Sequence, residues 1–127
     1  MKNIVDTILA VGGEHVQFIL LFGSQAQGTQ KTYSDTDITI GYNGPHKHKF
    51  LIDVAAALPN TADISLFDQL PLVIRDQASR GRILYSRDKS ETMQHLLGVR
   101  KEFSRFKKHY DEHTKARRER LYAQNKN

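Results

Sequence analysis

A dense apolar run limits the fold of this chain more strongly than any other sequence feature. The run occupies residues 15–22 and lies between Gly12-Gly13 and Gly23. A short apolar segment bounded by glycines is typical of a strand buried inside a sheet. We therefore predict a buried strand at residues 15–22, around which the other elements are arranged.

The rest of the chain alternates between strand and helix patterns. Period-two alternation predicts three more strands, at residues 35–42, 61–67 and 82–85. Apolar residues at helical spacing, stopped by glycine or proline, predict helices at residues 2–11, 46–58, 71–80 and 88–122. This order of elements predicts a layered α/β domain that carries one long C-terminal helix.

Length and composition limit the class of protein. A chain of 127 residues with 39% hydrophobic residues favours one domain with one modest core. The absence of cysteine excludes disulfides and cysteine-based zinc sites, and it suits a reducing cytoplasm. We expect no signal peptide. The longest apolar run, residues 18–22, is far too short to cross a membrane, so we expect a cytoplasmic protein without membrane contact.

Positive charge is concentrated near the end of the chain. Residues 100–127 contain ten Lys or Arg and four Asp or Glu, whereas residues 1–99 contain nine and ten. We therefore divide the chain into a core at residues 1–88 and a basic helix at residues 89–127. Such a helix can bind nucleic acid or an acidic protein surface, or it can simply present a solvated face.

Three acidic residues stand out as candidates for chemistry. Asp35 and Asp37 are two apart on a predicted strand, so their carboxylates project to the same face. Because like charges repel at that distance, a divalent cation such as Mg²⁺ is their natural partner. Asp63 lies on the next predicted strand. If the two strands are neighbours, Asp63 completes a cluster that can hold two metal ions and can accept a proton from an attacking hydroxyl.

The loop after the buried strand suits a phosphate group. Gly23 lets the backbone approach closely, and Ser24 adds a hydroxyl beside backbone N–H groups at the start of a short helix. Gln25, Gln27 and Thr29 offer further hydrogen bonds. The loop and the acidic pair are separated by ten residues, and this combination is far more specific than either part alone.

These motifs resemble those of the nucleotidyltransferase superfamily that includes DNA polymerase beta, and within it the minimal nucleotidyltransferases (MNT or MntA-like proteins). The resemblance is carried by Phe-Gly-Ser-Gln-Ala-Gln-Gly-Thr at residues 22–29 and Ser-Asp-Thr-Asp-Ile at residues 34–38. It continues in Leu-Pro-Leu at residues 70–72 and Gly-Arg-Ile-Leu-Tyr at residues 81–85. It covers roughly residues 1–88 and implies a small mixed β-sheet flanked by helices.

The resemblance also implies a reaction and a partner. Gly23 and Ser24 would anchor the β- and γ-phosphates of ATP. Asp35 and Asp37 would ligate two Mg²⁺ ions, and Asp63 would ligate one of them and act as the base. Minimal members of the family are typically antitoxins that transfer AMP to a tyrosine of an all-helical HEPN-type toxin, and this chain resembles them in size.

One departure from the family pattern concerns the phosphate loop. Family members commonly carry arginine near positions 25 and 27, where this chain has Gln25 and Gln27. Positive charge beside the triphosphate is thereby lost. Arg75, Arg80 or Arg82 can replace it if the fold brings one of them close.

Other functions remain open at the level of the sequence. The acceptor can instead be a small molecule or an RNA end, or the fold can be a non-catalytic module that blocks a partner. The basic helix allows nucleic-acid binding, although we do not favour it. His109, Glu112 and His113 match a zinc-peptidase spacing, but a third ligand and apolar surroundings are missing, so a solvated face explains them better.

Overall fold

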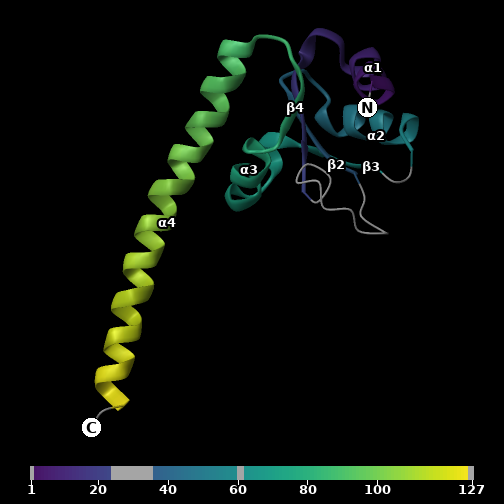
Figure 1. Ribbon diagram of the computed structural model, residues 1–127. Helices are drawn as coiled ribbons and strands as arrows, with labels where there is room; N and C mark the ends of the chain where they lie inside the picture. The colour runs from purple at the N-terminus through teal and green to yellow at the C-terminus, as the bar shows by residue number, and fades with distance from the viewer. Residues whose placement is uncertain (1, 24–35, 60–61, 126–127) are drawn as a thin grey trace.

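The computed structural model describes residues 2–23, 36–59 and 62–125 (Figure 1). Helices and strands alternate along it as the sequence predicts. In chain order they are α1 (Lys2–Gly12), a 3₁₀ turn (Gly13–His15), β1 (Val16–Phe22), β2 (Thr36–Tyr42), α2 (Lys47–Ala57), β3 (Ala62–Leu66), a 3₁₀ turn (Phe67–Gln69), α3 (Leu72–Ser79), β4 (Arg82–Ser86) and α4 (Lys89–Asn125).

The four strands form one mixed sheet in the order β3-β2-β1-β4. β1 pairs antiparallel with β2 on one side and with β4 on the other, whereas β2 and β3 run parallel. β1 is therefore an inner strand, and most of its residues are buried. This position explains why its sequence is a continuous apolar run rather than an alternating one.

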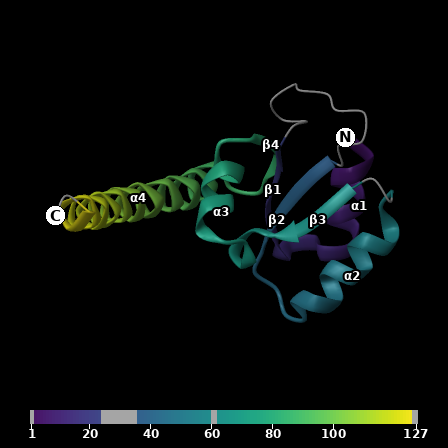
Figure 2. The same cartoon turned by 90° about the horizontal axis from the view of Figure 1, so that it is seen from below.

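One face of the sheet is covered by the first two helices (Figure 2). Ile8 of α1 and Phe50 and Val54 of α2 pack there against strand residues that include Ile19 and Ile38. Ile8, Ile19, Ile38 and Val54 are all fully buried. Burying each such side chain contributes about 1.5–3 kcal/mol, so this layer is a main source of stability.

The opposite face of the sheet is covered by α3 and the first half of α4 (Figure 2). Phe18 and Leu20 of β1 pack there with Phe67, Leu96 and Val99. The rings of Phe18 and Phe67 meet edge to face, with their centroids 5.3 Å apart. The predicted layered α/β fold is thus confirmed, with a mixed sheet between two helical layers.

Three strand boundaries among the described residues differ from the sequence prediction by one residue. One is the end of β4, which extends to Ser86 instead of residue 85. His15 ends the 3₁₀ turn that precedes β1, so the strand begins at Val16. Phe67 begins a 3₁₀ turn instead of ending β3. Its ring is fully buried against Phe18. The chain therefore turns toward α3 as soon as that aromatic contact is made.

α4 begins as the capping-box spacing predicts, since Asp88 Oδ1 accepts a hydrogen bond from the Glu91 N–H at 3.1 Å. With 37 residues it is roughly 55 Å long. Its first half packs on the core through Leu96 and Val99, and its second half extends beyond the core (Figure 1). Among the described helices none is long and apolar enough to cross a bilayer.

Candidate active site

Two of the predicted acidic residues lie side by side in the sheet. The parallel register of β2 and β3 pairs Asp37 with Asp63. Paired residues of parallel strands project to the same face, and neighbouring strands are about 4.8 Å apart. The condition set by the sequence, that the two strands be neighbours, is therefore met. Asp63 is exposed and Asp37 is half-buried, and each is the second residue of its strand. Both carboxylates therefore lie near the surface, at the end of the sheet where β2 and β3 begin.

Gly23 lies directly against this acidic pair. Its neighbour Phe22 pairs with Asp37 across β1 and β2, and Gly23 itself has a φ of +83°. A Cβ atom at Gly23 would overlap the Asp37 carboxylate oxygen Oδ2. The left-handed backbone therefore favours glycine here, and any side chain at this position would displace the Asp37 carboxylate. The sequence predicted only close approach to a phosphate at this position.

Other predicted site residues lie outside the described part of the chain. They are Ser24, Gln25, Gln27, Thr29 and Asp35. Within residues 2–23, 36–59 and 62–125, no three His, Asp or Glu side chains are grouped closely enough to hold a metal ion. The described part therefore supplies two of the three predicted carboxylates and the glycine beside them.

A reciprocal pair of hydroxyl hydrogen bonds holds the two acidic strands in register. Thr39 is fully buried, and its hydroxyl donates to the Ser65 carbonyl at 3.3 Å. The Ser65 hydroxyl donates to the Ile38 carbonyl at 3.4 Å. Thr39 and Ser65 lie two residues after Asp37 and Asp63 on the same strands, so their side chains are on the same face of the sheet as the two carboxylates. Thr39 was not among the predicted site residues, since a threonine in a strand gives no signal of a cross-strand bond.

The comparison with known families is clear over most of the chain. The family described as "Polymerase beta, Nucleotidyltransferase" matches residues 5–90. The chain belongs to this nucleotidyltransferase family. The matched segment contains the whole sheet, Gly23 and the acidic pair.

Solved structures of similar fold come from toxin–antitoxin complexes. One chain, from a toxin–antitoxin structure with AMP-PNP, is 20% identical with a TM-score of 0.67, over 85% of this chain and 90% of that chain. Another, from a tri-AMPylated Shewanella oneidensis HEPN toxin in complex with an MNT antitoxin, is 17% identical with a TM-score of 0.61, over 85% and 87%. A third, from an MntA–HepT complex, is 16% identical with a TM-score of 0.61, over 85% and 88%. No curated protein matches the sequence. At these identities the likenesses establish the fold.

The three arginines suggested as substitutes for the missing loop charges differ in their surroundings. Arg75 Nε donates to the Leu70 carbonyl at 3.0 Å, and Arg80 pairs with the carboxylate of buried Asp76 at 3.2 Å. Arg82 is exposed at the start of β4 and has no side-chain partner among the described residues. It pairs with Leu21, two residues before Gly23. Paired residues of neighbouring strands project to the same face, and Leu21 packs in the layer formed with α1 and α2. Arg82 therefore lies near the same end of the sheet but on the face opposite to Asp37.

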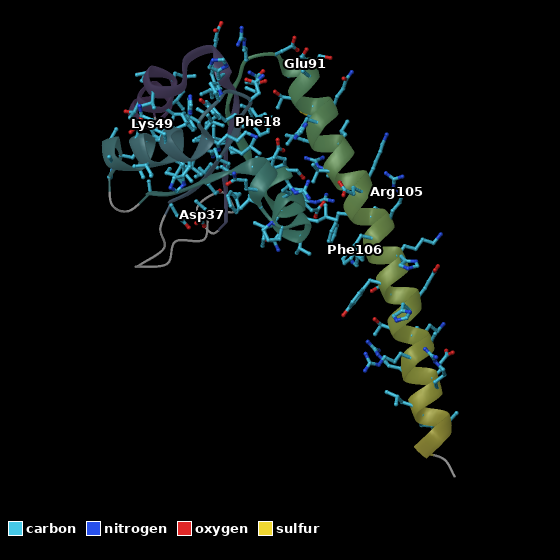
Figure 3. All side chains as sticks on the ribbon, turned by 180° about the vertical axis from the view of Figure 1, so that it is seen from behind. Phe18, Asp37, Lys49, Glu91, Arg105 and Phe106 are labelled. Atoms are coloured by element: carbon cyan, nitrogen blue, oxygen red, sulfur yellow. The ribbon has the colours of Figure 1, made fainter. Side chains whose placement is uncertain are left out.

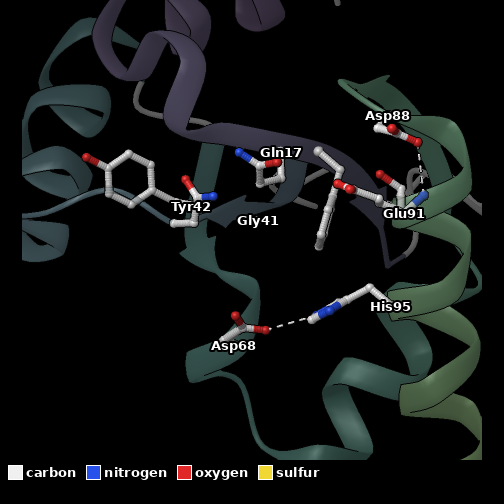
Figure 4. A pocket seen from close by; sticks show the side chains of 10 residues that line it. Gln17, Gly41, Tyr42, Asp68, Asp88, Glu91 and His95 are labelled. Atoms are coloured by element: carbon white, nitrogen blue, oxygen red, sulfur yellow. Dashed lines mark hydrogen bonds and ion pairs between the residues drawn. The ribbon is translucent and has the colours of Figure 1, made fainter.

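A cavity of the nucleotidyltransferase lies at the opposite end of the sheet (Figure 4). It has a volume of about 210 Å³, and His95 in its wall contacts Asp68 at 3.2 Å. Gly41 lines it and lies on the same strand as Asp37, four residues further along, which places the two about 13 Å apart. The acidic pair is thus at an open edge and not in this cavity.

Proposed function

We propose that this nucleotidyltransferase transfers AMP from ATP to a hydroxyl of a partner protein, a tyrosine of a HEPN-type toxin, and thereby acts as an antitoxin. The observation that carries the proposal is the pairing of Asp37 with Asp63 beside Gly23, inside the segment that matches the family. The structural neighbours support the choice of acceptor. They are toxin–antitoxin complexes, one with AMP-PNP and one with an AMPylated HEPN toxin.

The acidic pair fits a divalent metal ion. Two carboxylates on adjacent strands repel each other, and oxygen ligands of this kind are those that Mg²⁺ prefers. We propose Asp35, Asp37 and Asp63 as the ligands of two Mg²⁺ ions. When bound, Mg²⁺ would neutralise the negative charge of the carboxylates and of the triphosphate.

The residues of the chain bind the phosphates and accept the proton of the acceptor hydroxyl in the proposed reaction. Gly23 and Ser24 bind the β- and γ-phosphates through backbone N–H groups and the serine hydroxyl. The acceptor oxygen attacks the α-phosphorus as the bond to the β-phosphate bridging oxygen breaks, and pyrophosphate leaves. Asp63 is exposed, so its carboxylate is accessible to take the proton from the acceptor hydroxyl.

A label-transfer experiment tests this function. The purified protein is incubated with α-phosphate-labelled ATP, Mg²⁺ and host lysate, and the proteins are then separated. We expect one labelled protein band that requires the metal and is absent with Asp37→Asn. The matched control is Asp53→Asn, an exposed aspartate of α2 on the other side of the sheet, which should label as the wild type does.

Two other outcomes would replace the proposal. If nucleotide binds but no protein is labelled, the acceptor is a small molecule or an RNA end. If neither binding nor labelling occurs, the chain is a binding module that blocks its partner. Labelling that persists in Asp37→Asn contradicts the role of the acidic pair.

A further inference from the structure

One face of α4 packs on the core and then continues without interruption beyond it. Thr92, Leu96 and Val99 are buried on this face. Because each residue turns a helix by about 100°, the same face continues through Phe103, Phe106, Tyr110, Arg117 and Leu121. In the described part of the chain, no other element lies along this second half of α4 (Figures 1 and 2).

The exposed part of this face begins with a row of aromatic rings. The Phe103 and Phe106 ring centroids are 6.4 Å apart, and those of Phe106 and Tyr110 are 6.0 Å apart. Phe106 is 48% exposed, Tyr110 57% and Leu121 51%. Large apolar side chains that gather in one exposed strip typically mark a contact surface for another molecule.

Basic and acidic residues are unevenly distributed around the second half of α4. Over residues 106–121 the side that continues the core-packing face carries four basic residues and no acidic one. They are Lys107, Arg117, Arg118 and Arg120. The outer side carries two basic and three acidic residues, which are Lys108, Lys115, Asp111, Glu112 and Glu119. The side with the aromatic strip thus has four more basic than acidic residues, whereas the outer side has one more acidic than basic residue and Asp111 lies at the border between them.

The strip lies on the side of α4 that faces the core and, with it, the acidic pair. Figure 3 shows Phe106 on the core side of α4 and Arg105 on the outer side. The same view shows Asp37 at the end of the core toward which the second half of α4 extends. A molecule that rests on the strip therefore lies on the same side of α4 as α3 and the end of the core that carries Asp37.

We propose that this strip is the docking surface for the acceptor protein, which meets it with an apolar groove rimmed by carboxylates. The proposal rests on the proposed function and names how the acceptor is held. Charge complementarity selects an acidic partner surface, because the half of the helix that carries the strip has a net positive charge. It disfavours a second copy of this chain, whose strip would carry the same charge. The strip continues in Leu121, and an aliphatic side chain fits an apolar protein groove but does not stack on a base, which favours a protein over a nucleic acid.

The test compares variants in the label-transfer assay, using the acceptor protein identified from the labelled band and then purified in its unmodified form. The variants Phe106→Ala with Tyr110→Ala, and separately Arg117→Glu, change the strip. Their matched controls are Tyr122→Ala and Lys115→Glu, which lie away from it on the same helix. We expect the acceptor concentration for half-maximal rate to rise about tenfold or more for the strip variants. The saturated rate and nucleotide binding should stay unchanged, and the controls should match the wild type.

Each alternative has its own result. If strip variants and controls label equally well while the wild type is active, docking lies elsewhere and only this inference fails. If the strip variants instead lose binding to a labelled single-stranded 20-nucleotide RNA with label transfer unaffected, the surface binds RNA and the proposal is overturned. A dimer in light scattering that Phe106→Ala dissociates overturns it in favour of self-association. If the wild type labels no protein, the proposed function and this inference fall together.

Discussion

The face of the sheet beneath α3 and α4 has two ends of opposite character. At one end Phe18, Phe67 and His95 pack together, with ring centroids between 5.3 and 5.7 Å apart. At the other end Asp37 and Asp63 are paired on adjacent strands, where like charges weaken the sheet. The aromatic end thus holds the fold together, whereas the acidic end is the part on which the proposed reaction depends. Substitutions at the two ends should therefore separate activity from stability.

The largest expected effect is on catalysis, at the acidic end. Asp37→Asn should lower the rate of AMP transfer on the order of a thousandfold, because a metal ligand worth several kcal/mol of transition-state stabilisation is lost. The free energy of unfolding should change by less than about 1 kcal/mol, since Asp37 is half-buried beside another acid. Initial rates of labelling and urea unfolding measure the two quantities. A large loss of stability would show that Asp37 stabilises the fold, as the residues of the aromatic end do.

The second prediction concerns the aromatic end, where a substitution should lower stability and leave activity nearly unchanged. Leu96 is 1% exposed, and Leu96→Ala should lower the free energy of unfolding by about 3 kcal/mol through lost burial and a cavity. Leu97 is the matched control because it is 44% exposed, so Leu97→Ala should change stability by less than about 0.5 kcal/mol. Urea denaturation gives both values. Below the unfolding transition, the transfer rate of Leu96→Ala should stay within about twofold of the wild type.

Gly23 connects the two properties and should affect both. Gly23→Ala places a Cβ on the Asp37 carboxylate and strains a φ of +83°, so we expect about 1–2 kcal/mol of destabilisation and a loss of transfer. Gly13→Ala is the control, since Gly13 also has a positive φ but nothing lies within 4 Å of its Cβ position. Gly13→Ala should lose similar stability and keep its activity. Equal activity in both variants would contradict the close approach of Asp37 to Gly23.

The smallest expected effect is at the cavity beside the packed end. His95→Ala removes ring contacts with Phe18 and Phe67 and the contact with Asp68. His95 is 44% exposed, so stability should fall by only about 1 kcal/mol. The transfer rate should remain within about twofold of the wild type, as the labelling assay measures. A strong loss of activity would instead place the cavity in the reaction.

Much of this architecture could be predicted from local patterns. Strands and helices follow from period-two and helical spacing, which depend only on nearby residues, and each predicted element is present within one or two residues of its bounds at most ends. Phe67 is an instructive exception. The alternating pattern predicts that Phe67 belongs to the strand. Its position is instead set by packing against Phe18, which is nearly fifty residues away in the sequence, so no local pattern reveals it.

The candidate site was predicted in part. The sequence selected Asp37, Asp63 and Gly23 from motif spacing, and the fold places the three together, while their catalytic roles remain predictions. The link between Thr39 and Ser65 was not predicted, because a buried hydroxyl in a strand looks like any other strand residue. Ser24 and Asp35 also remain predictions.

By itself the sequence determined the types of the elements, the concentration of positive charge in the last helix and the residues able to carry the chemistry. Only the tertiary structure decided that β2 and β3 run parallel and in register, so that Asp63 stands beside Asp37. Only the tertiary structure showed that Gly23 leaves space for the Asp37 carboxylate and that the core-packing face of α4 continues beyond the core. The physical reason is that periodicity is a property of neighbouring residues, whereas strand pairing and packing depend on the whole chain.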